Sequence, residues 1–93
     1  MFLFKNDYLS KKKMKVSLLY FGVTRDYANR DEESMELNSD QSVFTLRKNL
    51  MLLYPELAQM NSFAVAVNES YATDEMILKE GDTVAIIPPV SGG

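Results

Sequence analysis

The stretch that decides the fold is GDTVAIIPPVSGG, residues 81–93. Within it, residues 83–87 are apolar on both faces of an extended chain, which is typical of a strand in the centre of a sheet. Proline fixes φ and has no N–H group, so Pro88 and Pro89 cannot extend the hydrogen-bond ladder. We therefore expect a central strand that ends at Ile87.

The residues after this strand, 88–93, are predicted to form an extended tail. The two prolines favour a stiff, polyproline-like exit, and Gly92 and Gly93 have no Cβ, so they can enter a cleft too narrow for side chains. Six residues reach roughly 20 Å when extended, which is enough to cross a subunit boundary. We expect the tail to present the carboxyl group of Gly93 to a partner; a frayed terminus is the alternative.

The clearest helical pattern lies between a turn at residues 38–40 and Pro55. Asp40 or Ser42 can cap a helix there, and Pro55 disfavours helical geometry at Tyr54, so the helix should end at that residue. Its apolar stripe is predicted to consist of Val43, Leu46, Leu50 and Leu53.

Shorter patterns surround this helix. A β-prone run at residues 16–21 ends at Gly22, and Thr24 can cap a short helical stretch that reaches about Arg30. Ile77 and Leu78 are expected to cover apolar surface before the last turn. Further strands are predicted at residues 34–37, 63–67 and 71–73.

The predicted order is strand, short helix, strand, main helix and three strands. A helix with one apolar stripe is covered by a sheet on one side, which indicates an α+β fold with a mixed sheet packed on one main helix. This is the β-grasp, or ubiquitin-like, architecture. The predicted organisation is a basic N-terminal extension at residues 1–13, a β-grasp domain at 14–87 and the tail at 88–93.

Composition restricts the chemistry of the chain. Its 93 residues suffice for one domain, and an apolar share of 46% is ordinary for a globular protein. There is no histidine and no cysteine, which excludes the usual zinc sites, Ser-His-Asp triads and cysteine nucleophiles. We expect no bound metal or cofactor. No window approaches the ~18 apolar residues of a membrane span, and the lack of cysteine makes the cytoplasm the default location.

Charge is unevenly distributed along the chain. Residues 1–13 carry a net charge of +3 and the remaining residues a net charge of −6, which together give −3. The predicted domain is therefore acidic and a poor candidate for binding nucleic acid. An acidic domain is instead steered toward basic partner surfaces.

Several side chains allow two interpretations. Ordinary core packing is expected for Tyr20, Phe21 and Phe63, although one of them on an exposed sheet face would suit partner docking. Arg25 and Arg47 are interpreted as solvated surface charges rather than intersubunit ion-pair partners. The acidic run at residues 31–33 is interpreted as a solvated turn.

The same segments resemble one known family. The stretch GDTVAIIPPVSGG strongly resembles the end of the small subunits of molybdopterin synthase, the MoaD family. The likeness continues upstream and covers about residues 14–93. It includes KVSLLYFG at residues 15–22, LR at 46–47, YPEL at 54–57 and AVN at 66–68.

This resemblance implies a sulfur carrier without catalytic side chains of its own, the donor subunit of a sulfurtransferase. In the family, an activating enzyme similar to those of ubiquitin uses ATP to adenylate the terminal carboxyl group, here that of Gly93. A desulfurase system then supplies sulfur to form a thiocarboxylate. The carrier docks on a large catalytic subunit, in a heterotetramer, and delivers sulfur to cyclic pyranopterin monophosphate during molybdenum cofactor biosynthesis.

The resemblance also implies roles along the tail. Gly92 would pass the narrow approach to the reaction centre, Ser91 and Val90 would contact the channel, and Pro88 and Pro89 would aim the tail. Three alternatives remain at this point: a sulfur carrier for thiamin synthesis or tRNA thiolation, a ubiquitin-like protein modifier, and an interaction domain whose tail does no chemistry.

Overall fold

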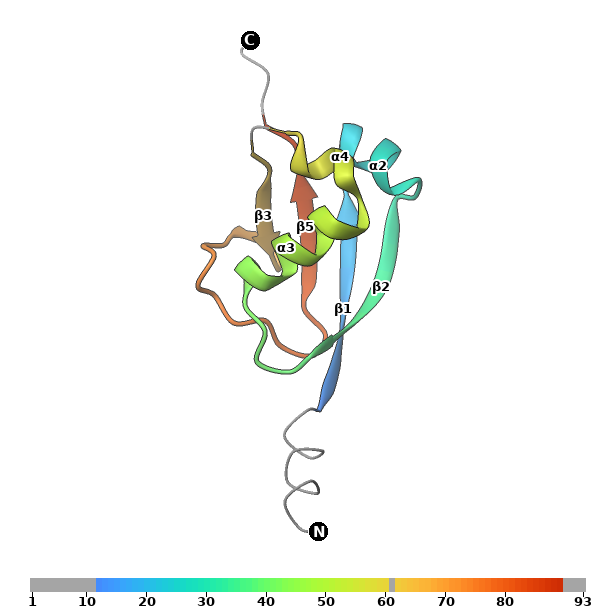
Figure 1. Ribbon diagram of the computed structural model, residues 1–93. Helices are drawn as coiled ribbons and strands as arrows, with labels where there is room; N and C mark the ends of the chain where they lie inside the picture. Colours follow the sequence, from blue (N-terminus) through green and yellow to red (C-terminus); the bar gives the residue numbers. More distant parts are fainter. Residues whose placement is uncertain (1–11, 61, 90–93) are drawn as a thin grey trace.

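The computed structural model describes residues 12–60 and 62–89, and Figure 1 shows how they are arranged. Five strands form one mixed sheet in the spatial order β2-β1-β5-β3-β4. They are β1 (Lys13–Tyr20), β2 (Glu32–Asn38), β3 (Ala64–Val67), β4 (Ser70–Tyr71) and β5 (Thr83–Ile87). β5 pairs in parallel with β1 and antiparallel with β3, so the predicted central position of the last strand is confirmed.

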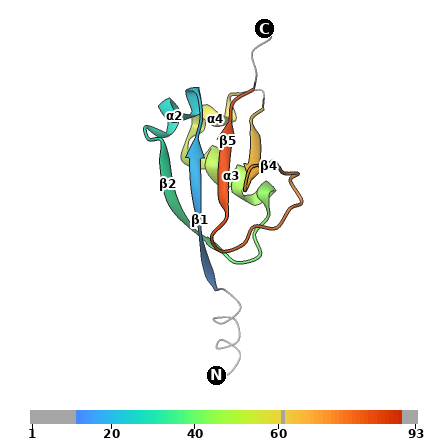
Figure 2. The ribbon, with the colours of Figure 1, turned by 180° about the vertical axis from the view of Figure 1, so that it is seen from behind.

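The helices lie on one side of this sheet. The main helix, α3 (Val43–Leu53), crosses one face of the sheet, whereas no helix of residues 12–60 and 62–89 covers the face seen in Figure 2. α2 (Val23–Ala28) and α4 (Pro55–Ala58) lie near the end of the sheet at which β5 ends (Figure 1). The predicted α+β, β-grasp architecture is confirmed.

The ends of the main helix follow from its sequence. Ser42 is the N-cap, because its Oγ accepts a hydrogen bond from the Thr45 N–H at 3.2 Å, so of the two predicted caps Ser42 is the one used. The helix ends before Pro55, with Tyr54 as its C-cap.

The predicted apolar stripe is correct for three of its four members. Val43, Leu46 and Leu50 are fully buried, but Leu53 is 53% exposed. The backbone leaves helical geometry at Tyr54, and the ring of Tyr54 packs against the core where the stripe continues. Similarly, Leu78 is buried as predicted, whereas Ile77 lies exposed.

Several strand boundaries differ from the prediction by one to three residues, and those of β1 and β2 change the interpretation of nearby residues. β1 begins at Lys13, within the predicted N-terminal extension, and residues 1–11 lie outside the described part of the chain. The interpretation of residues 31–33 as a solvated turn is wrong for Glu32 and Glu33, which belong to β2. Glu33 pairs with the buried Leu18, so its side chain is drawn toward the helix side of the sheet.

Glu33 joins two tyrosines there. The hydroxyl groups of Tyr20 and Tyr54 each donate a hydrogen bond of 2.8 Å to Oε1 of Glu33. The two rings meet edge to face with their centroids 6.0 Å apart. Burial, followed by the hydrogen bond to Glu33 and its negative charge, raises the pKa of Tyr20 far above its ordinary value, and the same causes raise the pKa of Tyr54.

This cluster predicts a loss of stability at alkaline pH. Unfolded Tyr20 loses its proton near pH 10.0 while folded Tyr20 keeps it, so the stabilisation is complete below that pH and declines above it. The expected decline is up to about 1.4 kcal/mol per pH unit. Urea unfolding from about pH 9 to about pH 11 measures it. Tyr20→Phe should flatten the profile and Tyr71→Phe, at an exposed site, should leave it unchanged; parallel profiles for all three chains would contradict the assignment.

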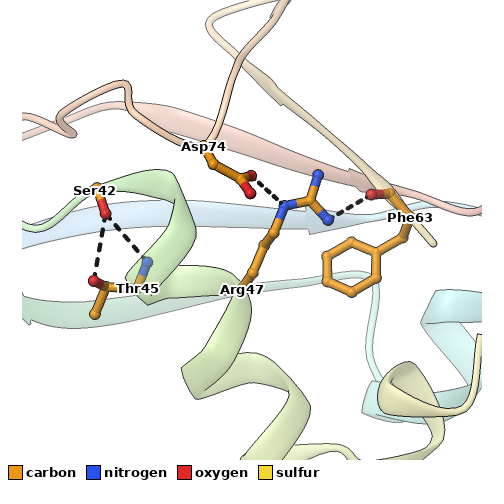
Figure 3. A network of polar contacts seen from close by, with 5 residues as sticks. All are labelled: Ser42, Thr45, Arg47, Phe63 and Asp74. Carbon is orange, nitrogen blue, oxygen red and sulfur yellow. Dashed lines mark hydrogen bonds and ion pairs between the residues drawn. The ribbon is translucent and has the colours of Figure 1, made fainter.

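Arg47 forms a second polar cluster, shown in Figure 3. Its Nε donates to Oδ1 of Asp74 at 2.8 Å, and its Nη1 donates to the Phe63 carbonyl at 2.6 Å. The guanidinium also lies over the Phe63 ring, 4.7 Å from its centroid. Arg47 therefore ties α3 to the segments on both sides of the β3–β4 hairpin, and its interpretation as a solvated surface charge is wrong.

Removal of this guanidinium should destabilise the fold. Arg47→Met keeps most of the aliphatic volume but leaves the Phe63 carbonyl without its charged donor, and we expect a loss of about 2 kcal/mol. The exposed part of the Asp74 ion pair adds little to this value. Urea unfolding at neutral pH measures the change, with Arg25→Met as the matched control, because the 3.6 Å ion pair of Arg25 with Asp31 is exposed on both sides. Equal effects of the two substitutions would contradict the structural role of Arg47.

Candidate functional site

The backbone at the end of β5 is held on both sides. Ile87 still pairs with Ala64 of β3, and Ile86 pairs with Tyr20 of β1. The Phe21 N–H donates to the Ile86 carbonyl at 3.0 Å. Pro88 and Pro89 therefore follow a strand whose position is set by both neighbouring strands.

The first residue of the tail packs on the turn after β1. Gly22 has φ +55°, and a Cβ at this position would lie 2.9 Å from Cγ of Pro88, so the proline ring occupies the space that a side chain would need. Pro88 is half-buried and Pro89 is exposed. Pro88 thus packs as part of the folded body, whereas Pro89 does not.

Thr24 completes this arrangement, in a role other than the predicted one. Gly22 is the N-cap of α2, and no side chain caps the helix, so the prediction that Thr24 caps it is wrong. The Thr24 hydroxyl is fully buried and donates to the carbonyl oxygens of Phe21 (2.6 Å) and Ile86 (3.3 Å). We call Phe21, Gly22, Thr24, Ile86 and Pro88 the tail root.

Four of the predicted site residues lie beyond the tail root and outside the described part of the chain: Val90, Ser91, Gly92 and Gly93. Their predicted roles remain predictions. For the two prolines, the described structure gives Pro88 a packing partner and leaves Pro89 at the point where the chain departs.

The helix-free face of the sheet is apolar beside the tail root. Leu19 pairs with Ala85, Ala85 with Ala66, and Ala66 with Tyr71, so these four residues form one row across four strands. A shallow hollow of about 560 Å³ lies over this row and extends to Phe21 and Ile87, and the polar residues Asn68, Glu69 and Thr83 also line it. We call this surface the open sheet face; it consists of Leu19, Phe21, Ala66, Tyr71, Ala85 and Ile87.

Phe21 is the aromatic residue for which the expected core packing is wrong. Tyr20 and Phe63 are buried as expected for core packing, but Phe21 is 48% exposed, on the open sheet face. Neither Leu19 nor Tyr71 was predicted as part of a site. One sequence signal could have indicated this surface, namely the apolar character of both faces of β5. The face turned away from α3 must either have a neighbour or remain exposed as a docking surface.

Polar groups flank the open sheet face near the tail root. A second, smaller hollow is lined by Arg25, Asp31 and Glu32 together with the end of β1. Within residues 12–60 and 62–89, no group of three or more acidic side chains lies close enough to hold a metal ion. None of the helices in that part of the chain is long and apolar enough to cross a membrane.

Comparisons with known proteins agree with this fold. The profile of the ThiS family matches residues 18–93. The molybdopterin synthase sulfur carrier subunit of Chlamydomonas reinhardtii is 36% identical over 83 residues, which cover 86% of this chain and 100% of the relative.

Two solved structures are similar as well. The Pyrococcus furiosus protein described as molybdopterin converting factor, subunit 1, is 29% identical with a TM-score of 0.76, over 83% of this chain and 99% of that one. A chain in the complex of subunits 1 and 2 of the molybdopterin-converting factor of Helicobacter pylori is 26% identical with a TM-score of 0.59, over 86% of this chain and 100% of that one. The chain described here thus belongs to the ThiS family of ubiquitin-like β-grasp proteins, in the group formed by the molybdopterin synthase sulfur carrier subunits.

Proposed function

We propose that this chain is the sulfur carrier subunit of a molybdopterin synthase and carries sulfur as a thiocarboxylate on Gly93. The observation that carries the proposal is the tail root. The last strand is fixed by both neighbouring strands and Pro88 packs on Gly22, so the position from which residues 89–93 follow is set by the folded body. The names of the family's members and the family-typical sequence of residues 81–93 support the same function.

The proposed chemistry needs no side chain of this protein. A carboxylate is a poor electrophile, so a partner first joins the Gly93 carboxylate to AMP from ATP and releases pyrophosphate. Hydrosulfide supplied by a desulfurase system then displaces AMP and leaves the thiocarboxylate. Its anionic sulfur is nucleophilic at neutral pH, as a thiolate is, and displaces an oxygen substituent from a carbon of cyclic pyranopterin monophosphate in the partner's site. Water then hydrolyses the resulting thioester, which leaves the sulfur on the pterin and returns Gly93 as a carboxylate. Positioning and charge stabilisation come from the partner.

We propose that the open sheet face docks on that partner. The exposed apolar surface lies beside the tail root. A partner that binds this surface would therefore also receive the tail in its reaction centre. The Helicobacter pylori complex of subunits 1 and 2 supports a large subunit as this partner. We place this activity in the cytoplasm, where the absence of cysteine is ordinary.

The test is the mass of the intact chain after incubation with a cognate activating enzyme, ATP and a sulfide source. We expect an increase equal to the difference between one sulfur atom and one oxygen atom, located on Gly93 by fragmentation. An unchanged mass, with the same enzyme active on a control carrier, would overturn the proposal. Attachment of Gly93 to lysine side chains of other proteins would instead favour a protein modifier. Rescue of a thiamin-requiring strain, without rescue of a strain lacking the pterin-synthase small subunit, would favour the thiamin pathway.

A further inference from the structure

β2 is an edge strand whose outer backbone groups can be identified from the register. In an antiparallel pair, residues that exchange backbone hydrogen bonds alternate with residues that do not. The Ser39 N–H donates to Lys12 at one end of the β1–β2 pair, and the Tyr20 N–H donates to Asp31 at the other, both at 2.8 Å. Both ends therefore assign the bonds with β1 to the odd-numbered residues of β2.

The even-numbered residues of β2 consequently direct their N–H and C=O groups away from β1. These residues are Glu32, Ser34, Glu36 and Asn38, and all four are exposed. In the described part of the chain the sheet ends at β2, as Figures 1 and 2 show. We call this row of backbone groups the β2 edge. An exposed strand edge of this kind is a template for one more strand.

The side chains of the β2 edge select against a second copy of this chain. Glu32 and Glu36 point to the helix-free face, the side on which their β1 neighbours Leu19 and Lys15 lie. Antiparallel pairing of two β2 edges would bring the glutamates of one copy against those of the other, and like charges across a strand pair are destabilising. Lys15 lies directly opposite Glu36 on β1, the inner neighbour of β2. The side of Glu36 that faces away from β1 is therefore available to a partner.

We propose that the β2 edge binds an extended segment of a partner protein in which lysine or arginine alternates with apolar residues. The basic side chains lie beside Glu32 and Glu36 on the helix-free face. The apolar side chains lie on the other face, beside the half-buried Met35. This inference does not rest on the sulfur-carrier function, because it uses neither the tail root nor the open sheet face.

The probe is a short capped peptide in which lysine and valine alternate, added to the full chain labelled with ¹⁵N. We expect the amide hydrogens of Glu32, Ser34 and Glu36 to exchange about fivefold more slowly when the peptide is bound, through the new hydrogen bonds. The amide hydrogens of Glu33, Met35 and Leu37, which already pair with β1, should change little. Binding of the peptide without this alternation of slowed and unchanged amide hydrogens along β2 would indicate electrostatic adsorption and would overturn the proposal.

Modified peptides sharpen the test. N-methylation of either the lysines or the valines blocks one edge of the peptide strand, so one modification should abolish binding and the other should not. In antiparallel pairing the lysine amides face the β2 edge, so methylation of the lysines is the damaging change. Loss of binding with both modifications, or with neither, would contradict strand addition. A peptide with glutamate in place of lysine should not bind.

Matched variants of the protein test the charge requirement. The double substitution E32Q/E36Q should raise the Kd of the lysine peptide about fivefold, since two cross-strand charge pairs are lost. The double substitution E69Q/E75Q makes the same change in net charge at exposed positions outside β2 and should leave Kd unchanged. Equal effects of the two double substitutions would overturn the proposal, because they would indicate attraction by overall charge alone.

Discussion

Deletion of Gly93 is expected to abolish thiocarboxylate formation and sulfur transfer, with a loss of at least about 100-fold. The shortened chain still ends in a glycine carboxylate, but its carboxyl group is set back by one residue, roughly 3.5 Å of reach. Misplacement of a reacting group by ~1 Å already costs about 100-fold. The intact mass after activation and the rate of pterin sulfuration with the large subunit measure the effect.

The control for this deletion is the folded body. Thermal unfolding and binding to the large subunit should stay close to those of the full chain, because the tail root and the open sheet face are unchanged. An alanine appended after Gly93 should be equally inactive, since it adds length and a Cβ at the narrow end. Full activity of either variant would show that the carboxyl group of Gly93 is not the sulfur-bearing group.

The substitution Phe21→Asp is expected to weaken binding to the large subunit at least about 30-fold while the thiocarboxylate still forms in a saturating amount of activating enzyme. Phe21 is a large aromatic side chain on the open sheet face beside the tail root. Aromatic residues in such positions carry much of the energy of an interface, and a carboxylate there must be desolvated on docking. Titration calorimetry with the large subunit measures the change.

Phe44→Asp is the matched control for Phe21→Asp. Phe44 is 51% exposed, close to the 48% of Phe21, but it belongs to α3, on the other side of the sheet. It should retain binding, and both variants should keep their unfolding free energy within about 0.5 kcal/mol, as is usual for surface positions. Equal weakening by both substitutions, or none by Phe21→Asp, would show that the open sheet face is not the docking surface.

Local patterns sufficed for most of the architecture. Ser42, the stripe from Val43 to Leu50 and the Pro55 stop define a helix by interactions within one element, and these appear in the periodicity of the chain. The position of β5 was also predictable, because a strand that is apolar on both faces is stable only between neighbours. The extended tail stays a prediction, because residues 90–93 lie outside the described part of the chain.

The wrong predictions concern side chains whose positions depend on packing or hydrogen bonds that the local pattern does not record. Leu53 fits the helical stripe, but Tyr54 takes its place over the core because the chain turns there. Arg47 resembles a surface charge in sequence, yet Asp74 and the Phe63 carbonyl hold it. Glu33 lies in an acidic run that suggests a turn, but it belongs to β2 and accepts hydrogen bonds from the hydroxyl groups of two tyrosines. The partners of Glu33 and Arg47 lie 13 to 27 residues away in sequence, whereas Tyr54 directly follows Leu53.

The sequence by itself determined the order of the five strands, α2 and α3 and the central last strand, because propensity and periodicity act over a few neighbouring residues. The short helix α4 at Pro55–Ala58 was not part of the predicted order. Only the tertiary structure decided that Pro88 packs on Gly22, that Thr24 binds the end of β5, and that Phe21 faces outward next to them. The physical reason is that β1 and β5 come together through parallel pairing across most of the chain. Periodicity records which side of its own element a residue occupies, and it carries no information on which distant element packs there.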